Sequence, residues 1–186
     1  MLPTALIPIR TGRTAKRRLA HVLGPDERDA LVRSLFDHVA AVVLEAGLRT
    51  VALTPGSIQP PDGVEVWPDE GAGLNRAVQA ALLRTGVPVL VVHADLPLLS
   101  PADVDCVLAS EADVVIARSE DGGTNGLLMR RLITPAFGSG SATLHASGAR
   151  GAGLRVHVLD TPGFATDVDD EVGLSACAAF FPGTRL

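Results

Sequence analysis

The 186-residue sequence is poor in aromatic residues, which make up 3% of it and include no tyrosine. Hydrophobic residues nevertheless reach 47%, so a core must be built from aliphatic side chains. No window approaches the roughly 18 apolar residues of a membrane span, and the apolar segment 2–9 is too short for a signal peptide. Cys106 and Cys177 lack the spacing of a metal or redox motif, so we expect both in the core. These absences predict a cytoplasmic protein with no membrane partner.

Positive charge is scarce as well. The formal net charge is −5, and the only dense cationic cluster consists of Arg13, Lys16, Arg17 and Arg18. A chain without a basic footprint is not expected to bind a nucleic-acid backbone. The five histidines show no metal-ligand spacing, so a zinc site is not expected either.

The pattern along the chain predicts a single α/β domain over residues 1–186, with a mostly parallel, Rossmann-like sheet flanked by helices. The expected strands are 4–9, 51–53, 64–67, 87–92, 113–117 and 154–159. The expected helices are 25–47, 74–84, 101–110, 141–147 and 170–180. After residue 117 the regular alternation of strands and helices gives way to loops rich in glycine and serine, with a short apolar segment at 127–129. We expect the acceptor substrate in this second half.

Asp95 is the most informative single residue, because it follows the apolar run 89–92 and is soon followed by Pro97. An apolar run of this kind indicates a strand buried on both faces of a parallel sheet. At the carboxyl end of such a strand, a lone carboxylate commonly holds a divalent cation against nucleotide phosphates. The alternative is an Asp that caps the next turn. Ser100 and Pro101 already supply the start of the following helix, which favours the metal.

Two segments before residue 80 suit a nucleotide. The loop 10–19 carries Arg10 and Lys16 directly after the first strand, and could wrap a triphosphate or be a solvated basic loop. It matches neither a P-loop nor a dinucleotide fingerprint. Gly73 lets the backbone approach a base or ribose, and Asn75 could read purine edge groups. An ordinary tight turn before a helix is the alternative.

Three segments after residue 117 suit an acceptor or a metal. Asp167 and Asp169 are two residues apart, so on an extended segment both point to one side, and with Asp95 they could complete a Mg²⁺ site. One acid of the run 167–170 could instead cap the last helix. The loops 121–126 and 137–141 offer glycine N–H groups and the Ser141 hydroxyl at a helix N-terminus, which suits an anion. Simple loop lengthening is the alternative there.

Seven segments taken in order resemble the 2-phospho-L-lactate or phosphoenolpyruvate guanylyltransferase family of deazaflavin coenzyme biosynthesis. They span almost the whole chain. The segments are Ile7-Pro8-Ile9, Ala15-Lys16-x-Arg18-Leu19, Gly73-Leu74-Asn75, His93-Ala94-Asp95-Leu96-Pro97, Asp121-Gly122-Gly123-Thr124-Asn125, Phe137-Gly138 with Ser141 and His145, and Asp167-Val168-Asp169.

The resemblance implies a nucleotidyltransferase fold, GTP as donor, Mg²⁺ as cofactor and a small phosphorylated carboxylic acid as acceptor. It implies a GTP-binding half over 1–117, and an acceptor-binding half over 118–186 that completes the metal site. It carries the triphosphate role onto Lys16, metal binding onto Asp95, Asp167 and Asp169, and acceptor binding onto Thr124, Gly138 and Ser141. Together with the reasoning from the residues, we expect nucleotide binding by Arg10, Lys16, Gly73 and Asn75, catalysis by Lys16 and Asp95, and acceptor binding by Asn125 beside Thr124. Two places depart from the family pattern, the run Arg10–Arg13 and the pair Asp170 and Glu171.

Two other functions stay open at this level. A molybdenum-cofactor or sugar-phosphate nucleotidyltransferase would share the fold, but those proteins usually open with Leu-Ala-Gly-Gly, where this chain has Leu6–Arg10. A nucleotide-binding regulatory module without turnover could dispense with the terminal acidic pair, which this chain has. The sequence leaves open which acid is the acceptor, and leaves the oligomeric state open, a homodimer included.

Overall fold

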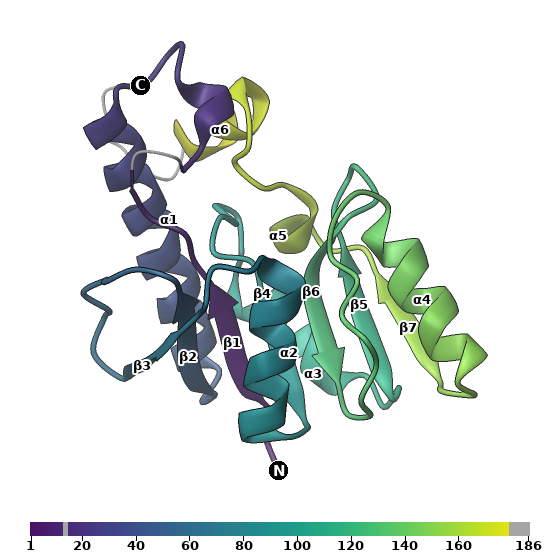
Figure 1. The fold of residues 1–186 in the computed structure, drawn as a ribbon. Coiled ribbons are helices and arrows are strands. Elements are labelled where there is room, and N and C mark those ends of the chain that lie inside the picture. The colour runs from purple at the N-terminus through teal and green to yellow at the C-terminus, as the bar shows by residue number, and fades with distance from the viewer. Residues whose placement is uncertain (13–14, 179–186) are drawn as a thin grey trace.

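A computed structural model of the protein describes residues 1–12 and 15–178, which include one seven-stranded sheet with helices on both of its faces (Figure 1). The strand order is β3-β2-β1-β4-β6-β5-β7. The strands are β1 (Thr4–Pro8), β2 (Arg49–Thr54), β3 (Val64–Pro68), β4 (Val89–Val92), β5 (Val114–Arg118), β6 (Thr124–Met129) and β7 (Val156–Leu159). The helices are η1 (Arg17–Leu19), α1 (Pro25–Glu45), α2 (Leu74–Thr85), α3 (Pro101–Ala109), α4 (Ser141–Gly151), α5 (Pro162–Ala165) and α6 (Glu171–Ala178).

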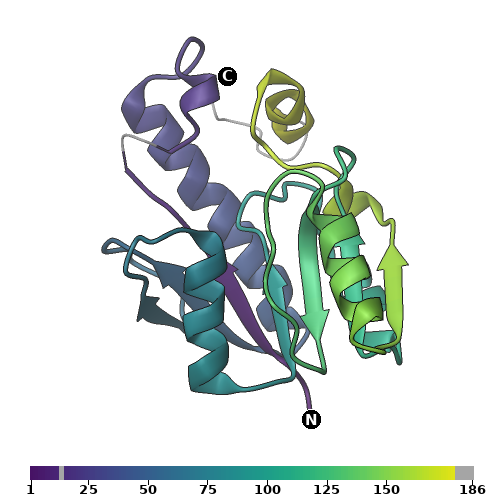
Figure 2. The same ribbon diagram turned by 45° about the vertical axis from the view of Figure 1, so that its right-hand side comes forward.

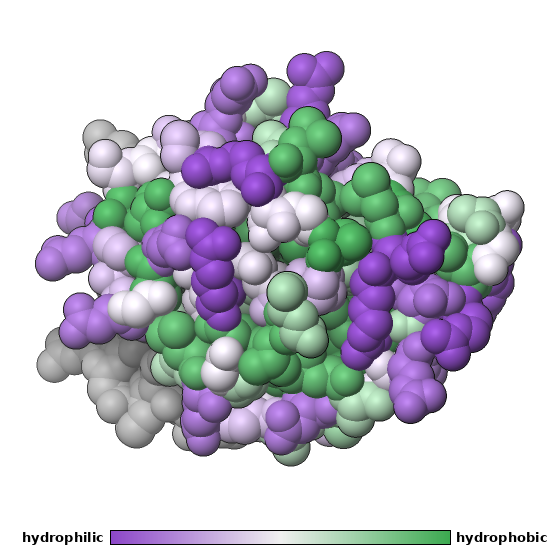
Figure 3. Space-filling model, turned by 90° about the horizontal axis from the view of Figure 1, so that it is seen from below, coloured by the Kyte–Doolittle hydropathy of each residue, from purple (hydrophilic) through white to green (hydrophobic). Residues whose placement is uncertain are grey.

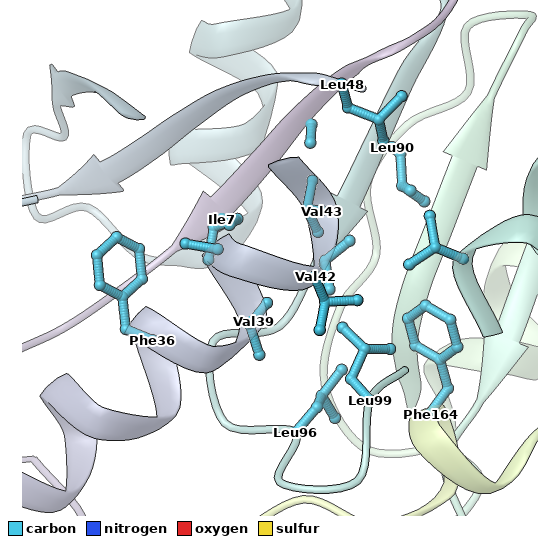
Figure 4. Close-up of a cluster of buried hydrophobic side chains, with 14 of the residues drawn as sticks. Ile7, Phe36, Val39, Val42, Val43, Leu48, Leu90, Leu96, Leu99 and Phe164 are labelled. Carbon is cyan, nitrogen blue, oxygen red and sulfur yellow. The ribbon is translucent and has the colours of Figure 1, made fainter. Parts of the chain in front are cut away.

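The side chains of the strands alternate between two hydrophobic clusters, one on each face of the sheet. Ala5 and Ile7 of β1 pack with α1 and α3, whereas Leu6 between them packs with α2 and α4. Figure 2 shows α2 and α4 on the near face, and Figure 4 shows part of the other cluster, in which Phe164 of α5 joins Val39 of α1. All four residues of β4 are buried, as a strand covered on both faces requires.

The predicted elements are largely confirmed, and their ends follow local signals. Helix α1 begins at a proline, carries acids in its first turn and buries an apolar face that includes Leu31, Leu35 and Val39. Helix α3 begins at Pro101 directly after Ser100, as the sequence predicts, and the Asp103 carboxylate accepts from the Ser100 N–H. The prediction for Cys106 is wrong, because this residue is exposed on α3, while Cys177 is buried as expected. Arg13 and the end of the helix predicted to reach residue 180 lie outside the described residues.

Strand β6 is the main addition to the predicted fold. It runs antiparallel between β4 and β5, whereas the pairs β1–β2, β1–β4, β2–β3 and β5–β7 are parallel. Residues 124–126 are therefore strand, and the open loop predicted over 121–126 is wrong for them. Gly126 is required there, since a Cβ would lie 2.6 Å from the Phe164 ring.

A third hydrophobic cluster closes the end of the molecule at which β1 and β4 terminate. It joins Leu19 of η1, Leu31 and Leu35 of α1, Val168 and Leu174. Because Leu19 and Val168 share this cluster, the segment after β1 and the acidic segment 167–169 are held against each other. The opposite end, seen in Figure 3, mixes hydrophobic and hydrophilic residues. Within the described part of the chain, no helix combines the length and apolar character that a bilayer crossing needs.

Candidate functional site

A cleft of about 480 Å³ opens at the carboxyl edge of β1 and β4, the two central parallel strands. Its apolar wall includes Leu53, Leu74 and Ala77, and its charged residues are Arg10, Lys16, Asp69, Asp95 and Asp169. In open α/β sheets this edge is where ligands bind. The cleft combines an apolar wall with charges of both signs, which suits a ligand that has a flat apolar part and an anionic part.

Lys16 lies at the centre of the charged residues. Its ammonium bonds to Oδ2 of Asp95 and lies 2.9 Å from Oδ1 of Asp169, while only 10% of its side chain is exposed. Among the described residues it is the only non-glycine residue with positive φ, at 47°. Strained backbone of this kind persists where surrounding contacts hold it, and it clusters at functional sites. Burial lowers the pKa of Lys16, but attraction to Asp95 and Asp169 outweighs burial and the net pKa is raised.

Asp95 is ionised and incompletely satisfied. Burial alone would raise its pKa, but the positive charge of Lys16 outweighs burial, so the pKa lies below its ordinary value. Its second oxygen, Oδ1, is buried and has no hydrogen-bond partner among the described residues. The Nε2 atom of neighbouring His93 is likewise buried without one. Burial lowers the pKa of His93, which favours the neutral ring. Buried polar atoms normally have a partner, so these two atoms mark a place for a ligand.

The acidic segment lies beside Asp95, as the hypothesis of a shared site requires. The backbone N–H of Val168 donates to the Asp95 carbonyl at 3.1 Å, and the Val168 side chain is fully buried. Burial and repulsion by Asp95 and Asp169 raise the pKa of Asp167 to about 6. Across residues 1–12 and 15–178, no group of three His, Cys, Asp or Glu side chains has the spacing of a metal site as it stands. The Lys16 ammonium lies between two of the predicted ligands instead.

Of the four residues predicted to bind a nucleotide, three line the cleft and Asn75 does not. Arg10 and Gly73 line the cleft, and Gly73 has φ of 98°, which strongly favours glycine. The Asn75 amide instead bonds to the backbone of Phe137: its Nδ2 donates to the Phe137 carbonyl at 3.1 Å, and its Oδ1 accepts from the Phe137 N–H at 2.7 Å. Asn75 thus joins α2 to the segment 130–140. A contact with a purine stays a prediction that this arrangement does not favour.

The predicted acceptor residues do not line the cleft, and most of their polar groups have partners inside the protein. Thr124 and Asn125 are each 2% exposed, and the Asn125 amide donates to the Phe164 carbonyl at 3.0 Å. The predicted anion site at the start of α4 is only partly available. The backbone N–H groups of Ser141 and Ala142 donate to the carbonyls of Gly138 and Gly122, so they are not free. Gly138 lies before this turn with φ of 136°.

Three residues to which the sequence assigned no role connect these segments. The His93 and Phe137 rings lie 5.6 Å apart, and the Phe137 and His145 rings 4.9 Å apart with edge contact. His145 also contacts Thr124. In the sequence, His93 lies two residues before Asp95 and His145 lies four residues after Ser141. This closeness to a predicted site residue was the only feature of the sequence that pointed to either histidine.

Solved structures with similar folds are nucleotidyltransferases and related proteins. A putative nucleotide-diphospho-sugar transferase from Desulfovibrio desulfuricans superimposes with a TM-score of 0.79 at 17% identity, covering 99% of this chain and 90% of that chain. A nucleotidyl transferase from Methanothermobacter gives a TM-score of 0.70 at 15% identity, covering 96% of this chain and 97% of that chain. At such identities the likeness defines the fold, which is that of the nucleotidyltransferases.

Sequence comparison narrows this class to one family. The family described as "Guanylyl transferase CofC like" matches residues 3–180, and the chain belongs to this family. A phosphoenolpyruvate guanylyltransferase from Sphaerobacter thermophilus is 35% identical, with 98% of this chain and 95% of that protein covered. A 2-phospho-L-lactate guanylyltransferase from Methanocella arvoryzae is 33% identical, with 89% of this chain and 75% of that protein covered. The resemblance seen in the sequence is confirmed.

Proposed function

We propose that this protein transfers the GMP group of GTP to a small phosphorylated carboxylic acid and releases pyrophosphate. The acceptor is phosphoenolpyruvate or 2-phospho-L-lactate, the two acids in the names of its relatives. The observation that carries the proposal is the buried Lys16 ammonium between Asp95 and Asp169, at the edge of the cleft between β1 and β4. Family membership supports guanylyl transfer over a molybdenum-cofactor or sugar-phosphate reaction.

The transfer replaces one bond to the α-phosphorus of GTP with another. An oxygen of the acceptor's phosphate attacks the α-phosphorus, and the bond to the oxygen that bridges toward the β-phosphorus breaks, so that pyrophosphate leaves with that oxygen. The attacking oxygen is already anionic at neutral pH, so no side chain needs to remove a proton. The obstacle is the repulsion between two polyanions. Lys16 lies where its charge can stabilise the triphosphate, and Arg10 at the cleft wall can add to this effect.

The residues at the cleft also fit Mg²⁺, which we propose as the cofactor. Carboxylate oxygens are its preferred protein ligands, and Asp95 has a buried oxygen without a partner among the described residues. Asp167 and Asp169 would complete the set, because Asp167 lies within electrostatic reach of both Asp95 and Asp169. When bound, Mg²⁺ would neutralise charge on the attacking and leaving oxygens. The Lys16 ammonium then offsets the charge of the carboxylates whenever the cation is absent.

The acceptor would lie next to the orphaned atoms of Asp95 and His93, on the side of β6 and the segment 130–140. The backbone N–H of His93 donates to the Asn125 carbonyl at 3.0 Å, which brings the start of β6 beside Asp95. Thr124, Gly138 and Ser141 are proposed to hold the phosphate or carboxylate of the acid close enough to attack. Asn125 would support this group through its bond to Phe164.

The test is pyrophosphate release from GTP and Mg²⁺ with one acid at a time: phosphoenolpyruvate, 2-phospho-L-lactate or 3-phosphoglycerate. We expect release with one of the first two, and a product whose mass is that of the acid plus a GMP group. Asp95→Asn serves as the matched control, since it keeps the side-chain volume and removes the charge. Absence of release with all three acids from a folded protein would contradict the proposal. A cytoplasmic location and a homodimer stay predictions beside it.

A further inference from the structure

His145 is a buried imidazole with both of its nitrogens engaged. It lies on α4, is 1% exposed and makes edge contact with the Phe137 ring at 4.9 Å between centroids. The Ala136 backbone N–H donates to its Nε2 at 2.9 Å, and its Nδ1 lies 3.0 Å from the Thr124 hydroxyl oxygen. One ring therefore ties together α4, the segment 130–140 and the start of β6.

These two contacts determine where the ring carries its proton. A backbone N–H can only donate, so Nε2 must be the unprotonated acceptor. In a neutral imidazole the proton then lies on Nδ1, which donates to the Thr124 oxygen. Burial, and secondly repulsion by His93, lowers the pKa of His145 to about 4, so the neutral ring prevails at physiological pH.

The same reasoning sets the role of the Thr124 hydroxyl. Its oxygen accepts from His145, and its own O–H has no hydrogen-bond acceptor among residues 1–12 and 15–178. An O–H donor buried without an acceptor is costly, and an anionic oxygen satisfies it best. The neighbouring His93 also carries a buried polar atom, Nε2, without a partner among the described residues.

We propose that His145 is a positioning residue for the acceptor, which makes the Thr124 hydroxyl an obligatory donor to an anionic oxygen of the acid. Through Ala136 it also holds Phe137 and Gly138 against the same place. This inference rests on the proposed function for the identity of the acid. His145 itself does not touch the reacting atoms. By fixing the Thr124 hydroxyl as a donor, His145 favours a ligand group that accepts a hydrogen bond, such as a carboxylate or phosphate oxygen, over a group that donates one.

Three substitutions separate the two contacts of the ring. His145→Phe keeps a ring against Phe137 and removes both hydrogen bonds. The amide of His145→Asn reaches the place of Nδ1, so it keeps a donor for Thr124. The amide of His145→Gln reaches the place of Nε2, so it keeps an acceptor for Ala136. His157→Gln is the control, because the exposed side chain of this histidine on β7 bonds only to Ser110 among the described residues.

We expect His145→Phe to raise the KM for the acid by about tenfold or more, the effect of a lost hydrogen bond to a charged group. The KM for GTP should change less than twofold. His145→Asn should recover most of the acid affinity and His145→Gln less of it, while His157→Gln behaves as wild type. A KM for the acid within twofold of wild type in folded His145→Phe would overturn the proposal, and so would equal increases in both KM values.

A second measurement does not depend on turnover. Nitrogen-15 NMR of the wild-type protein at pH 7 should show His145 protonated at Nδ1 only, and calorimetry should show weaker binding of the acid alone to His145→Phe. A proton on Nε2, or unchanged acid binding, would overturn the role of His145. If the wild type releases no pyrophosphate with any acid, the proposed function fails separately, and the proton position and acid affinity still decide this proposal.

Discussion

The ammonium nitrogen of Lys16 lies 2.9 Å from Oδ1 of Asp169, although the two residues are 153 positions apart. Lys16 also bonds to Asp95, so one cation serves carboxylates from two distant segments. Such a buried group responds strongly when one partner is removed, because a charge is then left unpaired.

Lys16→Ala should lower kcat/KM for GTP by about 100-fold, in the range of losses seen when one stabilising group is removed at a site of developing charge. Arg17→Ala is the control, since Arg17 is exposed next to it and makes no ion pair with another described residue. Steady-state kinetics with GTP varied would measure the effect. Equal small losses in the two variants would mean that the loop is only a basic surface.

Asp95→Asn should abolish turnover and leave the fold intact. The change removes the charge that we propose for Mg²⁺ binding, but it keeps the volume of a side chain at the end of a buried strand. Pyrophosphate release at saturating Mg²⁺ and circular dichroism would be measured together. Wild-type turnover in the folded variant would exclude Asp95 as a metal ligand.

Asn75→Ala should affect the acid more than GTP, although the sequence predicts a nucleotide contact. Its amide holds the Phe137 backbone through two hydrogen bonds, and Phe137 borders His93 and His145. We expect the KM for the acid to rise about tenfold, as for one or two lost hydrogen bonds. A selective rise in the KM for GTP would restore the nucleotide assignment.

Asp167 should make metal-free protein less stable as the pH rises. Its pKa is raised to about 6 in the folded state, chiefly by burial, so its stabilising contribution is present below its ordinary pKa of 3.8 and is lost as the pH rises through 6. Asp167→Asn should therefore raise the melting temperature at pH 8 in EDTA and have little effect near pH 4. Asp62→Asn, at an exposed position, is the control. Equal changes in the melting temperature of Asp167→Asn at both pH values would contradict the proposed effect of the Asp167 charge on stability.

Gly126→Ala should destabilise the protein by about 1–3 kcal/mol, the usual cost of overpacking a core. The added Cβ would lie 2.6 Å from the Phe164 ring and 3.0 Å from the Cβ of Ala117. Gly148→Ala on α4 is the matched control. Its Cβ would meet nothing within 4 Å, so helix propensity should make it neutral or stabilising. Urea unfolding of both variants gives the comparison, and an unaffected Gly126→Ala would show that Phe164 can move.

Local sequence patterns determined most of the elements and the position of Asp95 at the end of a buried strand. The buried run of β4 ends before Asp95, Ser100 begins α3, and the apolar face of α1 follows a helical period. These features depend on neighbours within a few residues, so a short window contains their physical cause. The spacing of Asp167 and Asp169 predicts two carboxylates on one side of an extended segment, and that stays a prediction.

Only the tertiary structure decided which groups meet. Lys16 reaches Asp169 because Leu19 and Val168 are buried in one cluster with Leu31, and β6 enters the sheet antiparallel because it pairs with β4 and β5 at once. Asn75 bonds to Phe137, 62 positions away, and His145 to Thr124, 21 positions away. A polar side chain can satisfy itself with many partners, and the packing of distant apolar residues selects among them. The choice of partner therefore depends on the whole fold, and it cannot be predicted from the residues that are neighbours in the sequence.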